Sequence, residues 1–112
     1  MPKFEVDGMK NIVIRNETSV MIITAYDPNR LAIRVGFSYL PIRMMIDCIN
    51  FLFENEKEIL ECLVKAGKIK KLESSYRINN ICFFYCGSAV LINRNDNKYE
   101  VRHKLLIAEQ GN

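Results

Sequence analysis

The chain has 112 residues, of which 49% are hydrophobic and 26% are charged. This composition excludes a disordered protein, and the length predicts a single domain over residues 1–112 whose core needs no metal or disulfide bond. The formal net charge of +3 is too small to imply a nucleic-acid partner by itself.

The sequence predicts a protein without membrane contact. No stretch approaches the roughly 18 consecutive apolar residues that a membrane-spanning helix needs. The first ten residues, MPKFEVDGMK, lack the apolar core of a signal peptide. We therefore expect a cytoplasmic protein that works inside its own cell or inside a host cell.

The first third of the chain predicts three antiparallel strands. Residues 11–15 and 19–26 are apolar and rich in β-branched side chains, and residues 31–38 alternate between apolar and polar side chains. The segment Asp27-Pro28-Asn29-Arg30 has turn chemistry, with proline at the second position. We expect a three-strand meander whose third strand has one solvated face.

The middle of the chain predicts helical structure. Apolar residues recur at helical spacing from Ile42 to Leu52, and again after Glu58. Acidic side chains come before basic ones along this stretch, an order that complements the helix dipole. Asn55 would cap a second helix and Gly67 would end it. The pattern leaves open whether one kinked helix or two short helices span residues 40–67.

The last third predicts a second meander. Its first strand lies within residues 76–84 or 81–86, and strands over residues 89–93 and 98–107 follow it. The order βββ-α(α)-βββ predicts an α+β domain: an antiparallel sheet of two three-strand meanders, with a central helix or helix pair packed on one face.

The four cysteines, Cys48, Cys62, Cys82 and Cys86, have spacings that argue against a zinc site. Cys82 and Cys86 lie on a predicted strand, where residues four apart are separated by about 13 Å at roughly 3.3 Å per residue. Zinc binds sulfur at about 2.3 Å, so these two thiolates cannot share one ion. We expect free thiols, no metal and no cofactor.

No catalytic constellation is predicted. His103 is the single histidine, and a nucleophilic site would require its strand to pair with the strand that carries Cys82 and Cys86. The acidic side chains between Glu54 and Glu61 wind around a helix instead of converging, and the five glycines are scattered. We expect a protein that is not an enzyme.

The apolar side chains exceed what one core needs. Phe83, Phe84 and Tyr85 are consecutive on a strand, so their side chains point to both faces of the sheet, whereas a two-layer domain covers one face. An uncovered aromatic face indicates a homodimer or an interface with another protein. Because aromatic residues dominate binding hot spots, we expect Phe53, Phe83 and Tyr85 to be the apolar anchors.

The positive charge is concentrated in the second half of the chain. Between Lys65 and Lys104 there are nine Lys or Arg residues and three Asp or Glu residues. We expect four of these cations to steer an acidic protein partner: Lys68, Lys70, Lys71 and Arg77. The alternative is that the basic face of this half binds a nucleic-acid backbone, although no recognised nucleic-acid motif is present.

These patterns together predict a non-enzymatic, protein-binding accessory module that forms a homodimer. The composition is rich in Asn, Lys and Ile, and the chain is small and has no catalytic set. Such features are typical of accessory proteins that bind a larger partner, such as a viral or phage inhibitor of a host defence or regulatory protein. A nucleic-acid-binding protein is the alternative.

Overall fold

The computed structural model describes residues 2–85, 87–95 and 98–102. Over these residues the elements, in chain order, are β1 (Lys3–Val6), β2 (Ile12–Arg15), β3 (Val20–Asp27), β4 (Ala32–Tyr39), the 3-10 helix η1 (Ile42–Met44), α1 (Met45–Glu54), α2 (Glu56–Lys65), β5 (Asn80–Tyr85), β6 (Ser88–Asn95) and β7 (Lys98–Arg102).

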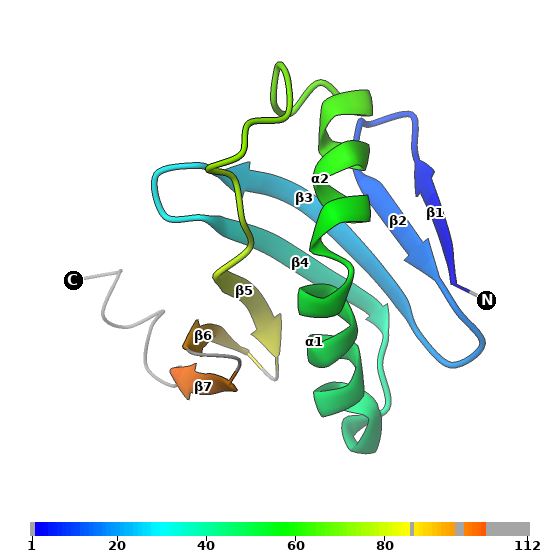
Figure 1. The fold of residues 1–112 in the computed structure, drawn as a ribbon. Helices are drawn as coiled ribbons and strands as arrows, with labels where there is room; N and C mark the ends of the chain where they lie inside the picture. The colour runs from blue at the N-terminus through cyan, green and yellow to red at the C-terminus, as the bar shows by residue number, and fades with distance from the viewer. Residues whose placement is uncertain (1, 86, 96–97, 103–112) are drawn as a thin grey trace.

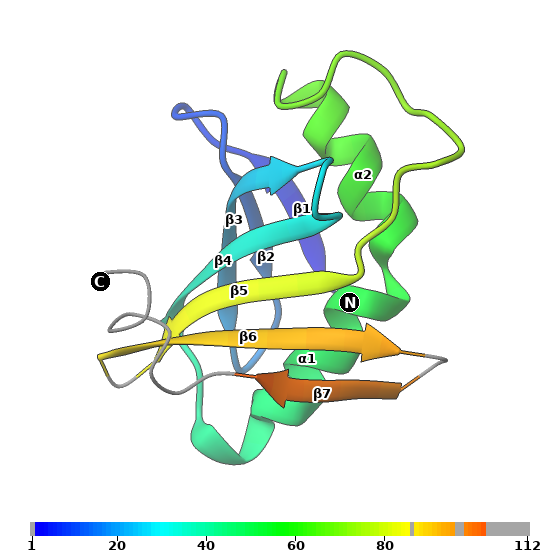
Figure 2. The ribbon, with the colours of Figure 1, turned by 90° about the vertical axis from the view of Figure 1, so that its left-hand side faces the viewer.

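The seven described strands form one sheet in the order in which they occur along the chain (Figure 1). Both helices lie in the connection between β4 and β5 and cover one face of the sheet (Figure 2). This arrangement confirms the predicted α+β class, with a helix pair on one face of the sheet.

Two features of the sheet differ from the prediction. The strand β1 precedes the expected first meander and pairs antiparallel with β2. It was missed because it has only four residues, too few for its alternation to stand out. The sheet is also mixed, because β5 runs parallel to β4. The two helices return the chain to the end of the sheet where β4 begins, so β5 starts there and runs in the same direction.

Two helices, not one, span the central segment, and they meet at Asn55. The backbone N–H and the side-chain Nδ2 of Asn55 both donate to the carbonyl oxygen of Phe51, at 3.0 and 2.8 Å. The Asn55 side chain therefore closes α1 and does not cap α2 as expected. The predicted end at Gly67 is confirmed. Gly67 has φ +75°, and Lys68 N–H donates to the carbonyl of Leu63 in a Schellman motif.

The core lies between the helices and the sheet, where apolar side chains cross the sheet in register. One row on this face contains Ile12, Ile23, Val35, Phe83 and Val90, and a second contains Tyr26, Ile33, Ile81 and Ile92. A bulge at Thr24 shifts the alternation of β3 by one residue, so Ile23 and Tyr26 both face the helices. The predicted alternation of β4 is confirmed, since Ile33 and Val35 are buried.

Candidate protein-binding site

A pocket of about 360 Å³ lies between α2 and the loop that follows it. This loop, residues 66–79, is called the α2–β5 loop below. The pocket is open to solvent and is lined by Glu56, Lys57, Leu60, Leu72, Glu73, Ser74, Tyr76 and Arg77. Leu60 is buried, while the side chain of Leu72 is 45% exposed. The pocket therefore combines an apolar surface with charged groups at its edge.

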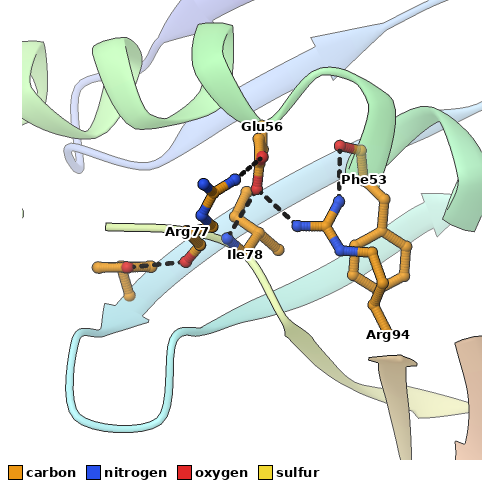
Figure 3. Close-up of polar contacts among 6 residues, drawn as sticks. Phe53, Glu56, Arg77, Ile78 and Arg94 are labelled. Atoms are coloured by element: carbon orange, nitrogen blue, oxygen red, sulfur yellow. Dashed lines mark hydrogen bonds and ion pairs between the residues drawn. The ribbon is translucent and has the colours of Figure 1, made fainter. Parts of the chain in front are cut away.

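A polar cluster around Glu56 fixes the last part of the α2–β5 loop (Figure 3). The Glu56 carboxylate accepts a hydrogen bond from the backbone N–H of Ile78 at 3.0 Å and one from the guanidinium of Arg94 at 2.8 Å. It also pairs with Arg77 at 3.6 Å. Because Glu56 begins α2, Ile78 precedes β5 and Arg94 belongs to β6, the cluster ties three parts of the fold together.

Arg94 also contacts the end of α1. Its guanidinium lies over the ring of Phe53, 4.9 Å from the centroid, and donates to the carbonyl oxygen of Phe53 at 3.5 Å. The side chains of Glu56 and Arg94 are 23% and 22% exposed. The guanidinium of Arg94 is thus held by Glu56 and Phe53, and it does not contribute to the basic face predicted for residues 65–104.

Tyr26 fixes the loop from the sheet side. Its hydroxyl donates to the carbonyl oxygen of Arg77 at 2.8 Å, and its ring meets the ring of Tyr76 edge to face, with centroids 5.8 Å apart. Burial raises the pKa of Tyr26 above its ordinary value of 10.0. The neutral phenol is therefore the form that supports the loop.

This pKa shift predicts a stability effect at alkaline pH. The unfolded chain ionises Tyr26 near pH 10, whereas the folded chain keeps it neutral, so the contribution is complete below pH 10 and declines as pH rises through the raised pKa. We expect Tyr26→Phe to cost about 1 kcal/mol of unfolding free energy near pH 8. Urea unfolding of both proteins should show that the difference between their unfolding free energies becomes smaller above pH 10. A difference that stays constant or grows would contradict the inference that the neutral phenol of Tyr26 stabilises the fold.

Of the predicted cations, Arg77 lines the pocket, and three lysines lie on the same loop outside the lining. Lys68, Lys70 and Lys71 are exposed on the α2–β5 loop, and the side chain of Arg77 is 61% exposed at the lip of the pocket. Lys65 is also exposed, at the end of α2. Within the described residues, none of these four lysines forms an ion pair. They are therefore available to an anionic partner.

The predicted aromatic anchors lie elsewhere. Phe83 is fully buried and Phe53 is 6% exposed, so both belong to the core, and a partner can reach neither without opening it. For Tyr85, which ends β5, only the backbone position is described. The exposed aromatic of this run is Phe84, 62% exposed on the face of the sheet opposite the helices. The apolar groups at the pocket are Leu60, Leu72 and Tyr76, none of which was among the predicted anchors.

Two of the described cysteines have thiols of low reactivity. Burial raises the pKa of Cys48 and, separately, that of Cys62, so both thiols stay protonated near neutral pH. The hypothetical pair of Cys86 and His103 lies outside the described residues. Among the described residues, no group of three or more His, Cys, Asp or Glu side chains is placed to hold a metal ion.

None of the described helices is long and apolar enough to cross a membrane. Comparisons with protein families, with curated proteins and with solved structures found no match to this chain.

Proposed function

We propose that the chain is a non-enzymatic protein-binding module that holds an acidic segment of another protein at the pocket beside α2. One observation carries this proposal: the α2–β5 loop, whose Leu72, Tyr76 and Arg77 line the pocket, also carries the exposed Lys68, Lys70 and Lys71, which form no ion pair with another described residue. Between Lys65 and Asn79 there are five basic residues and one acidic residue, Glu73. A partner that carries carboxylates next to an apolar side chain would complement both properties.

The two parts of the site would have different tasks. Exposed ion pairs contribute about 0–1 kcal/mol each, so the lysines mainly steer and orient the partner. Leu72, which is 45% exposed, would supply most of the contact energy, because burying apolar area contributes roughly 25 cal/mol per Å². The cluster around Glu56 holds the loop in place, so the loop loses less conformational entropy when a partner binds.

A module of this kind would act by covering a surface of its partner. Its small size and its composition support an accessory or inhibitory role, such as that of a viral or phage inhibitor of a host defence or regulatory protein. No chemical step is needed for this role.

The same lysines favour a nucleic-acid backbone as the second candidate ligand. Such a ligand would gain most from aromatic rings on which bases can stack. The aromatic ring nearest the pocket, that of Tyr76, is half-buried and held against Tyr26. We therefore rank the acidic protein segment first.

Charge reversal on the loop separates these candidates. We expect the triple variant Lys68→Glu, Lys70→Glu, Lys71→Glu to lose at least about tenfold in affinity for an acidic protein partner at low salt. The measurement is quantitative affinity capture with mass spectrometry, together with the ratio of absorbance at 260 and 280 nm of the captured material. A high ratio at low salt that falls at high salt would favour nucleic acid.

The matched control changes the same amount of charge elsewhere. Lys3, Lys10 and Arg43 are exposed and lie outside the pocket. The triple variant Lys3→Glu, Lys10→Glu, Arg43→Glu should retain the captured partner. Equal loss in both triple variants would contradict a specific site at the pocket.

A further inference from the structure

The face of the sheet opposite the helices, called the open face below, is not covered by any described helix (Figure 2). Phe84 is the most exposed large apolar side chain described on this face, at 62%. Monomeric proteins rarely expose large contiguous apolar patches, and Ile22, Ala25 and Leu91 lie around Phe84 on this face. This face lies on the other side of the sheet from the pocket, so a ligand on it would be separate from the proposed function.

The side chains of the open face alternate in size along each row. In the first row Ile22 pairs with Gly36, and Phe84 pairs with Ala89. Gly36 lies beside Phe84, one residue beyond the printed parallel pair of Val35 with Phe83. In the next row the order is Ala25, Arg34, Cys82 and Leu91. Large and small residues therefore follow one another across the strands.

We propose that a second copy of this chain covers the open face and forms a two-fold symmetric sandwich of two sheets. Consider a two-fold axis parallel to the strands, midway between the sheets and between β4 and β5. This axis places each β4 over β5 of the partner subunit, and each β3 over β6 of the partner subunit. The same patch then contacts itself, as a two-fold interface requires.

In this arrangement the large residues of the two rows described above meet small ones. Phe84 lies over Gly36 of the partner subunit, and Leu91 lies over Ala25 of the partner subunit. Ile22 lies over Ala89 of the partner subunit, but Ala89 is only 2% exposed and adds little contact area. Packed sheets are rotated by about 30°, which displaces the outer pairs more than the central one. The pair of Phe84 with Gly36, next to the axis, therefore carries the argument.

The space that this pairing needs is present at Gly36. A Cβ atom added there would have Ile22 O, at 4.0 Å, as its nearest neighbour. The glycine thus leaves a depression beside Phe84 that no described side chain fills. A ring from a facing sheet, at the usual spacing of about 10 Å, can enter it.

The area and the polar rim of the face also fit a dimer. Strand spacing of about 4.8 Å and a rise of about 3.3 Å per residue give the strands β2–β6 a footprint of roughly 540 Å². This footprint is about two thirds of the roughly 800 Å² per partner of a standard interface. A polar row of Asp27, Asn80 and Asn93 borders the apolar centre. Arg34 lies next to that row, so its long side chain can keep its charge in solvent.

The first test is the mass in solution of the full chain, by light scattering after size exclusion at about 1 to 100 µM. We expect twice the mass of 13.0 kDa at the higher concentrations. Phe84→Glu should raise the dissociation constant at least about thirtyfold. Ile46→Glu is the matched control, since Ile46 is also 62% exposed but lies on α1, and it should leave the dimer intact.

The second test exchanges the large and small residues. Gly36→Phe should produce a folded monomer, because its added Cβ has no neighbour closer than 4.0 Å in its own chain, whereas its ring would meet Phe84 of the partner subunit. Adding Phe84→Gly to it restores a large residue opposite a small one, and the double variant should form the dimer again. Circular dichroism reports whether each variant is folded.

The outcomes that overturn the proposal are equally specific. If the wild-type chain is a monomer at every concentration, a second copy does not cover the open face. Residues 103–112 or another protein would then be its ligand. A dimer that survives Phe84→Glu but not Ile46→Glu would place the interface on the helices. A double variant that folds but stays monomeric would exclude the pairing of Phe84 with Gly36.

Discussion

Replacing Phe83 with alanine is expected to lower the free energy of unfolding by about 3–5 kcal/mol, the usual cost of removing a buried ring. Phe83 is fully buried, and its ring meets that of Phe37 edge to face, with centroids 5.0 Å apart and planes at 84°. Both neighbouring strands and the helices surround the site, so the cavity cannot collapse easily. Urea unfolding measures the change, which would be a large share of a total stability of about 5–15 kcal/mol.

The next residue along the chain provides the control. Phe84 has the same side chain on the same strand, but it faces away from the helices and is 62% exposed. Phe84→Ala should change the stability by less than about 0.5 kcal/mol, when measured at a protein concentration low enough to dissociate a dimer. A loss from Phe84→Ala as large as that from Phe83→Ala would contradict the sidedness of β5.

Removing the Glu56 carboxylate is expected to have the second-largest effect, a loss of about 2–4 kcal/mol for Glu56→Ala. The change leaves the Ile78 N–H and the guanidinium of Arg94 without their acceptor. Both side chains of the pair are less than a quarter exposed, so water replaces the carboxylate incompletely. Glu56→Gln keeps one acceptor oxygen and should cost less, about 1–2 kcal/mol.

A double-mutant cycle isolates the interaction between Glu56 and Arg94. We expect Glu56→Gln combined with Arg94→Leu to cost less than the sum of the two single changes, with a coupling of about 1–2 kcal/mol. Glu58→Gln is the control, because Glu58 is exposed on the same helix and forms no ion pair with another described residue. Strictly additive effects would show that the contact does not stabilise the fold.

Much of the fold could be predicted because its signals are local. The alternation of β4, the turn after Asp27 and the glycine after α2 all act within a few residues. The direction of β5 relative to β4 could not be predicted, because it depends on the end of the sheet to which the two helices return the chain. The bulge at Thr24 was also hidden, since β3 is apolar at nearly every position and shows no break in its pattern.

The candidate site was predictable only in part. The lysines of the loop are exposed, as a charged run after a helix indicates. Whether Phe83 or Phe84 is exposed depends on which face of the sheet the helices cover, and the sequence of the strand does not contain this information. Arg94 was counted as a surface cation because its partner, Glu56, is 38 residues away. Contacts of this range leave no local pattern.

Site-specific photo-crosslinking at the pocket tests the central claim most directly. A photoreactive amino acid in place of Leu72, which is 45% exposed, should join covalently to one protein through an acidic segment. The same group in place of Met9, which is 79% exposed and lies outside the pocket, should give no such product. A product at residue 9 alone, a nucleic-acid product at residue 72, or no product at either position would contradict a protein-binding site beside α2.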